Sequence, residues 1–360
     1  MSNKQNLKNI NTYNLLYEFS HNYDKINIKE IEPIINDYIF EKDLSILIDR
    51  LVDIIFKELN EGNDAIVIKQ HVLEYTNNRN ITLQEIYNYL LNNQCKSNSI
   101  YLLGYFNYYG IGANSNKKMA IELYQNAAKL ENKAAELSLI NEYLYGKIVN
   151  KNYTTTFELS KNLAKEGYAC ALNNLGYCYE NGYGTDINEE KAFELYQKAA
   201  DLGNSGGMTN LGWCYYEGIG TDINYQKVCE LFQKAADLGN SNGIFSLGYC
   251  YKEGIGTNVN EQKAFELYQK AVDLENLTAI YNLIWCYEGV GTDINKQKVF
   301  ELSQKAANLG SSTAQYNIAY MYDIGIDVKK DTKQAIYWYK KSAEQGHQDA
   351  KKKLNELLKN

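Results

Sequence analysis

The sequence predicts an all-α protein, a solenoid of about seven 36-residue helix-turn-helix repeats behind an N-terminal helical cap. Three observations predict it. A leucine column recurs every 36 residues, the apolar residues of each unit follow two helical stripes, and asparagine and glycine stand where those helices should begin and end. The single proline, Pro33, leaves the repeat region free of the residue that breaks helices.

The leucine column sets the period. Several of its members are followed by glycine and an aromatic residue, as in Leu175-Gly176-Tyr177. The column consists of Leu103, Leu139, Leu175, Leu211, Leu247 and Leu283, and then Ile318 after a one-residue deletion before Gly289. Units therefore start near residues 103, 139, 175, 211, 247, 283 and 318, and Leu354 belongs to a capping helix.

Each unit predicts two amphipathic helices, A and B. Helix A carries apolar residues on one face, as in Ala171, Leu175, Cys178 and Tyr179. Helix B repeats the spacing of Ala192, Leu195, Tyr196, Ala199 and Ala200. The expected N-caps of helix B are Asn188, Asn224, Asn260, Asn295 and Asp331. The expected glycines just after helix B are Gly167, Gly203, Gly239, Gly310 and Gly346. Glu131 and Glu275 replace that glycine in two units, so those turns should close differently or under slight strain.

Three regions are expected along the chain. Residues 1–28 form an Asn-rich, flexible N-terminus, and residues 29–97 form the N-terminal helical cap. Within the cap, residues 43–94 predict three helices, with a capping box at Thr82–Glu85. Residues 98–357 form the repeat solenoid. Two such helices alone bury too little surface, so each pair must stack on the next.

Composition argues against several classes of function. The formal net charge is -7 with a sequence pI of about 5.3, which offers no basic field for a phosphate backbone, so nucleic acid is not an expected partner. The first twenty residues have neither the basic nor the apolar block of a secretory signal, and no apolar run is long enough to insert into a bilayer. We therefore expect a cytoplasmic protein, or a nuclear one, without membrane insertion.

The best-formed unit resembles a known family. The run Asn174-Leu-Gly-Tyr-Cys-Tyr-Glu-Asn-Gly-Tyr-Gly, followed by Lys191-Ala and Tyr196-Gln-Lys-Ala-Ala, resembles the Sel1-like repeat, a TPR-like and HCP-like helical repeat. The resemblance covers roughly residues 98–357. It implies a right-handed α-α superhelix, with helix A on the inner, concave wall, that serves as a non-enzymatic protein-protein interaction scaffold or adaptor in signalling or complex assembly. The unit from Leu139 departs from the pattern, with Ile140 and Ile148 in place of glycines, so it should cap and pack differently.

A second resemblance concerns the cap. Residues 43–94 are similar to the stretch between a protein kinase domain and Sel1 repeats in some fungal proteins. This resemblance leaves open a regulatory repeat portion of a kinase-linked signalling protein. The chain itself has no H-R-D, D-F-G or V-A-I-K string, so it is not a kinase.

The cysteines predict buried free thiols, with no metal and no cofactor. Cys178, Cys214, Cys250 and Cys286 recur every 36 residues. Equivalent helices of stacked repeats lie at least about 8–10 Å apart, which is too far for a disulfide or for four ligands on one zinc ion. Cysteine-rich relatives of the resembled family carry a disulfide within each repeat, but Lys198-Ala199-Ala200 lacks the required cysteine.

Short strings that mimic catalytic motifs have simpler explanations. Ser205 and Ser241 each lie in a G-x-S-x-G string, but the first glycine is the expected end of helix B and the last is the small residue of the next helix A. Ser115 to Lys118 is an S-x-x-K string of the kind found in β-lactam-binding proteins, without its companion motifs. Repeated Gly-x-Gly pairs such as Gly254 and Gly256 lack the strand and the lysine of a phosphate loop. A hydrolase or β-lactam-binding protein is thus the less favoured alternative, and no catalytic residue is predicted.

A surface of helix A is the remaining candidate site. Residues one before and two after the column leucine lie about 60° apart beside the core stripe. They are Asn174 and Tyr177, Asn210 and Trp213, Ser246 and Tyr249, Asn282 and Trp285, and Asn317 and Tyr320. Aromatic rings supply contact area and amides bind peptide backbone, so this ladder predicts a groove for partner proteins or extended peptides. Alternatively, the asparagines bond neighbouring repeats and the aromatic rings only pack.

Overall fold

The protein is described by a computed structural model that covers residues 28–77, 81–146, 148–287 and 295–358, with side chains from residue 43 on. These residues form 18 helices and no β-strand, which confirms the predicted all-α repeat fold. The predicted flexible segment 1–28 lies outside the described residues except for Ile28. The chain divides into two compact units, residues 1–50 and 51–360, and the second contains the repeats.

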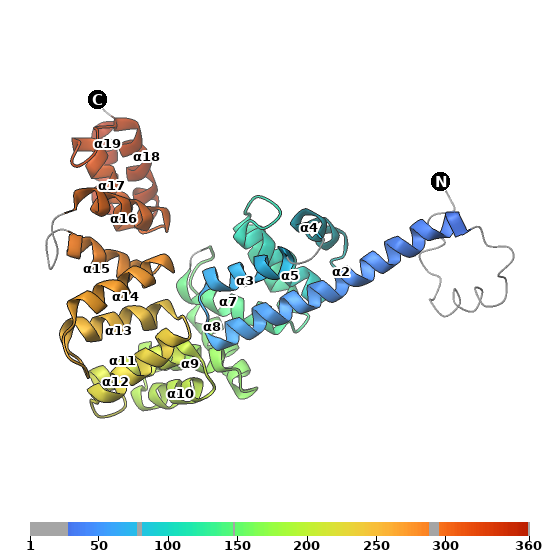
Figure 1. Ribbon diagram of the computed structural model, residues 1–360, viewed down its shortest axis with the longest axis horizontal. Coiled ribbons are helices and arrows are strands. Elements are labelled where there is room, and N and C mark those ends of the chain that lie inside the picture. Colours follow the sequence, from blue (N-terminus) through green and yellow to red (C-terminus); the bar gives the residue numbers. More distant parts are fainter. Residues whose placement is uncertain (1–27, 78–80, 147, 288–294, 359–360) are drawn as a thin grey trace. The chain divides into compact units, whose positions relative to one another are not determined.

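The repeats are seven helix pairs that follow one another in chain order (Figure 1). The helices ahead of them are α2 (Ile28–Glu61), α3 (Ala65–Asn77) and α4 (Leu83–Asn92). The pairs are α5 (Ser97–Tyr109) with α6 (Lys117–Ala128), α7 (Lys133–Tyr145) with α8 (Tyr153–Lys165), α9 (Ala169–Asn181) with α10 (Glu189–Asp201), α11 (Ser205–Glu217) with α12 (Tyr225–Asp237), α13 (Ser241–Glu253) with α14 (Glu261–Asp273), α15 (Leu277–Tyr287) with α16 (Lys296–Asn308), and α17 (Ser312–Ile324) with α18 (Thr332–Glu344). Helix α19 (Gln348–Leu357) closes the series and packs on α18.

Local sequence signals place the helix ends as predicted. All five expected N-caps of helix B accept a hydrogen bond from the first turn, and Thr82 and Glu85 form the expected capping box. The five glycines after helix B are left-handed, with φ from 79° at Gly239 to 94° at Gly310. Glu131 and Glu275 adopt the same backbone at φ 60° and 62°, which confirms the expected strain, since a side chain there costs about 1–2 kcal/mol.

Helices A and B of a unit meet most closely where a small residue of A faces a large one of B. A Cβ added to Gly248 would lie 2.8 Å from Cε1 of Tyr268, and three other units place a glycine against an aromatic ring in the same way. Those pairs are Gly104 with Tyr124, Gly176 with Tyr196, and Gly212 with Phe232. At the equivalent positions the second unit has Ile140 and Ser160 and the sixth has Ile284 and Ser303, all four buried. Because large and small residues exchange sides, the volume at this contact is preserved.

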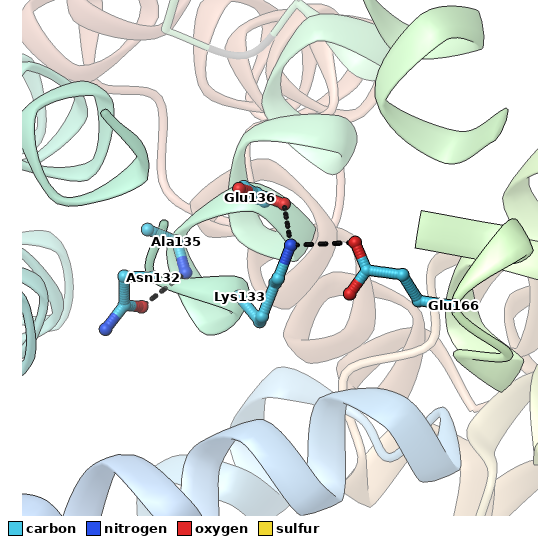
Figure 2. A network of polar contacts seen from close by, with 5 residues as sticks. All are labelled: Asn132, Lys133, Ala135, Glu136 and Glu166. Carbon is cyan, nitrogen blue, oxygen red and sulfur yellow. Dashed lines mark hydrogen bonds and ion pairs between the residues drawn. The ribbon is translucent and has the colours of Figure 1, made fainter. Parts of the chain in front are cut away.

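The second unit is therefore a regular helix pair, although its sequence departs from the repeat. Asn132 caps α7 by accepting a hydrogen bond from the Ala135 amide at 2.9 Å. The Nζ of Lys133 lies 2.9 Å from a carboxylate oxygen of Glu166, at the end of α8, and 3.4 Å from one of Glu136 (Figure 2). The expectation that this unit caps differently is wrong, because asparagine at the N-cap and Gly146 at the C-cap supply the usual ends.

In the Gly-x-Gly pairs that the structure describes, the second glycine brings the A–B turn against the preceding helices. A Cβ on Gly256 would lie 2.1 Å from the backbone oxygen of Tyr225, and one on Gly220 would lie 2.4 Å from that of Glu189. Both glycines also have positive φ, at 63°. The loops are thus tight turns, as predicted, and they are also contacts between repeats.

We expect Gly256→Ala to lower the free energy of unfolding by roughly 2–4 kcal/mol, because it adds a clash with rigid backbone to the cost of a left-handed alanine. Gly239→Ala is the matched control. Its φ is 79° and no atom lies within 4 Å of the added Cβ, so only about 1–2 kcal/mol should be lost. Urea unfolding followed by circular dichroism measures both losses, and equal losses would contradict the role of the inter-repeat contact.

Candidate partner-binding face

The structure places the ladder residues in three different environments. Asn174 and Ser246 are buried, at 6% and 1% exposure, so a partner cannot reach them without movement. Asn210 is half-buried and its Nδ2 donates to Oδ1 of Asn173, in the preceding repeat, at 2.9 Å. That bond is the inter-repeat role weighed as the alternative. Asn282 is also half-buried, and its Nδ2 donates to the backbone oxygen of Thr278.

The aromatic members become more exposed toward the C-terminal units. Trp213 is half-buried and its ring packs on Phe232, with 5.3 Å between ring centroids, so its removal would disturb the core. Tyr177 and Tyr249 are half-buried too. Trp285 and Tyr320 are 62% and 41% exposed, and Asn317, three residues before Tyr320, is exposed as well. The accessible part of the ladder therefore consists of Trp285, Asn317 and Tyr320, which we call the exposed ladder.

Residues 59–69 of the chain itself cover the same face of helix A in the first two units. A cavity of about 130 Å³ is lined on one side by Leu59, Ala65 and Ile68, among others. The other side includes Tyr105, Ser138 and Asn141, the ladder positions of α5 and α7. Lys69 adds a hydrogen bond from its Nζ to the backbone oxygen of Tyr109, at 3.1 Å. Sequence reasoning missed this contact, because nothing in residues 59–69 repeats with the 36-residue period.

The serine motifs have the structural roles that were predicted for them. Ser205 is buried, and a Cβ on Gly207 would lie 2.7 Å from that of Ala199, so the last glycine serves close helix packing. Gly203 is left-handed at φ 84°, as the end of helix B requires. Ser115 donates a hydrogen bond to the backbone oxygen of Tyr108 at 3.0 Å, and this bond belongs to the A–B turn.

The cysteines have no disulfide partners. Burial raises the pKa of the Cys178 thiol to about 11 and of the Cys214 and Cys250 thiols to about 12. Cys286 is only half-buried, and burial raises its pKa as well. Within the described part of the chain, no group of three or more His, Cys, Asp or Glu side chains could hold a metal ion.

We expect Cys178, Cys214 and Cys250 to react slowly with a maleimide in the folded protein, because a raised pKa keeps them as thiols at pH 7.5 and burial blocks access. Exposed Cys95 should react first, and Cys286 at an intermediate rate. Mass spectrometry of peptides sampled over time gives the labelling rates of these five cysteines. Labelling of the buried three as fast as Cys95, without denaturant, would contradict the structure.

No helix in the described ranges has the length and apolar character needed to cross a membrane. The fold of stacked helix pairs defines a class, the helical-repeat proteins, which present extended surfaces. The sequence profile of the Sel1 repeat matches residues 97–132, 171–204, 205–240, 241–276, 279–311 and 312–347, together more than half of the chain. The chain belongs to the Sel1 repeat family, whose members generally act as non-catalytic protein-interaction scaffolds.

One solved structure supports the fold. A Sel1 repeat protein from Oxalobacter formigenes is 20% identical and superposes with a TM-score of 0.51, over 88% of this chain and 90% of that one. A protective antigen of uropathogenic Escherichia coli with an SLR fold is 27% identical at a TM-score of 0.43, over 77% of this chain. This chain spans 59% of that antigen's length. No curated protein matches the chain.

Proposed function

We propose that this protein is a non-enzymatic scaffold or adaptor that binds partner proteins on the ladder face of helix A, with the exposed ladder as its main contact. The observation that carries the proposal is made in the first two units. There, residues 59–68 of the chain already pack against the same face of helix A. Since the units repeat, a face that receives a polypeptide at one end is suited to receive one at the other.

The chemistry of the exposed ladder fits a protein partner. Trp285 and Tyr320 offer large, rigid apolar surfaces that lose little conformational entropy on binding. Asn317 adds an amide donor and acceptor for the backbone of an extended peptide. The net charge of -7 favours proteins over nucleic acids as partners, and we place this role in the cytoplasm.

The test is an affinity capture with the full chain as bait, in three forms. Partners are identified by mass spectrometry for the wild type, for Trp285→Ala with Tyr320→Ala, and for Tyr337→Ala. Tyr337 is 48% exposed but lies on helix B, so it controls for the loss of any exposed ring. Proteins that bind the wild type and the Tyr337 variant, but not the double variant, support the proposal. Capture that the double variant leaves unchanged would refute it.

A signalling role is a second proposal, and it rests on the similarity of residues 43–94 to the segment that links kinase domains to Sel1 repeats in some fungal proteins. In that form the chain would be the regulatory repeat portion of a kinase-linked protein. The genomic reading frame upstream of Met1 tests it, because a kinase domain there would support this form and its absence would leave the adaptor.

A further inference from the structure

A carboxylate occupies a buried position of helix A in the second repeat. Glu142 of α7 lies three residues after the column leucine Leu139, and four later units have a cysteine at this offset. Glu142 is only 7% exposed, so this unit buries an acid where the others place a thiol. Burial of a charge is costly unless an opposite charge or hydrogen bonds compensate it. An acid at this position therefore needs a reason other than packing.

The described residues compensate this carboxylate only in part. The Tyr108 hydroxyl donates to Oε1 of Glu142 at 2.6 Å, whereas Oε2 is buried and has no hydrogen-bond partner among them. Two lysines of the same region bind elsewhere. Nζ of Lys69 donates to the backbone oxygen of Tyr109 at 3.1 Å, and Nζ of Lys117 lies 5.1 Å from the centre of the Tyr108 ring. Neither ammonium group forms an ion pair with Glu142.

Glu142 lines a cavity of about 130 Å³ between residues 59–68 and helices α5, α6 and α7, which we call the tyrosine cavity. Five tyrosines contribute to its wall, namely Tyr101, Tyr105, Tyr108, Tyr109 and Tyr124. Oη of Tyr105 is a second buried oxygen without a hydrogen-bond partner in the described part of the chain. Burial raises the pKa of Tyr109 to about 12, so its phenol is neutral at pH 7. Neutral aromatic rings beside a carboxylate attract a cation, because the face of each ring is electron-rich.

The size of the tyrosine cavity and its free oxygens indicate which cation it would take. A cavity of about 150 Å³ can hold benzene, so one of 130 Å³ has room for about five heavy atoms. A primary ammonium group has three N–H donors for acceptors such as Oη of Tyr105 and Oε2 of Glu142. A quaternary ammonium group has none. The cavity therefore fits a short primary alkylammonium ion.

We propose that the tyrosine cavity is a binding site for a primary alkylammonium group, which lies among the tyrosine rings and is neutralised by Glu142. The group belongs either to a free alkylamine or to the lysine side chain of a partner. None of the described residues that line the cavity is basic, so its wall does not repel a cation. The site is separate from the exposed ladder, and the inference does not rest on the proposed scaffold function.

The test measures binding of small probes to the full chain by isothermal titration calorimetry at pH 7. The main probe is n-butylammonium chloride. Two controls match its number of heavy atoms: n-butanol lacks the charge, and tetramethylammonium keeps the charge but lacks N–H donors. Nα-acetyl-lysine N-methylamide carries the same ammonium group on a peptide backbone. Binding of this compound together with n-butylammonium assigns a lysine side chain, and binding of n-butylammonium alone assigns a free amine.

Four variants complete the test, each checked for helicity by circular dichroism. Glu142→Gln removes the charge and keeps the shape, and Glu142→Cys introduces the residue that four later units have at this offset. Tyr105→Phe removes the unpaired hydroxyl and keeps the ring. Glu122→Gln is the matched control, because Glu122 is exposed on α6 and does not line the cavity. Lys69→Ala asks whether the Lys69 ammonium competes for the site.

The expected result is saturable binding of n-butylammonium to the wild type, to Glu122→Gln and to Lys69→Ala. Both Glu142 variants should bind it at least tenfold more weakly, because the charge partner is gone, and Tyr105→Phe at least threefold more weakly. The wild type should bind n-butanol and tetramethylammonium at least tenfold more weakly than n-butylammonium.

Five outcomes would overturn the proposal. No saturable binding would show that the cavity has no such ligand, and equal binding to both Glu142 variants would place the ligand elsewhere. If n-butanol or tetramethylammonium binds as tightly as n-butylammonium, the site does not select a primary ammonium. Displacement of n-butylammonium by an equal concentration of potassium chloride would assign an inorganic cation. Binding only to Lys69→Ala would show that Lys69 itself fills the site in the native protein.

Discussion

Gly248→Ile should lower the free energy of unfolding by about 3 kcal/mol, and Tyr268→Ser should partly restore it in the double variant. The isoleucine side chain meets the Tyr268 ring, 2.8 Å from the added Cβ, in a core that has no room for it. Tyr268→Ser alone should cost about 3–5 kcal/mol, because it removes a ring that is 1% exposed. No described residue hydrogen-bonds the Tyr268 hydroxyl, so no polar contact is lost with it.

In the double variant each substitution removes the defect that the other creates, as Ile140 with Ser160 does in the second unit. The coupling free energy should be roughly 2 kcal/mol or more in favour of the pair. Urea unfolding followed by circular dichroism gives the free energies of the wild type, the two single variants and the double variant. Hydrogen exchange of α13 and α14 shows where the effect is located. The control places the same two changes in different units, as Gly212→Ile with Tyr268→Ser. If that mismatched pair is rescued equally, size matching within a unit is not the cause.

Trp285→Ala with Tyr320→Ala should weaken the binding of a captured partner about thirtyfold or more, or roughly 2 kcal/mol, the loss typical of interface anchors. Both rings are exposed, at 62% and 41%, so helicity and melting temperature should change little. Trp213→Ala, in contrast, should lower the melting temperature. Its ring packs on Phe232, and loss of that contact opens the edge of the core.

Isothermal titration calorimetry with the captured partner, alongside thermal melting, separates these effects. Loss of affinity by the double variant at an unchanged melting temperature supports a role in recognition. A double variant that melts much earlier would show that the rings are structural, and one that binds normally would move recognition to another surface.

The helices and their ends could be predicted because their causes are local. Asn188 caps a helix through a bond to the amide three residues later, and Gly203 ends one through its own backbone angle. Such signals recur with the 36-residue period and reinforce one another. The candidate site could be predicted only in part, because exposure of a ladder position depends on neighbours. Trp213 and Trp285 have the same offset in their units, yet one packs on the core and the other faces solvent.

By itself, the sequence determined the all-α class, the repeat, the helix boundaries and the family. Only the tertiary structure decided which glycines face an aromatic ring, which turn contacts the preceding repeat, and where the turn between α2 and α3 contacts the repeats. The contact between Gly62 and Asn240 joins residues 178 apart, and it is made by a backbone oxygen that every residue has. A bond of that kind leaves no mark in composition or periodicity, so it emerges only when the repeats stack and bring their asparagine amides into one row.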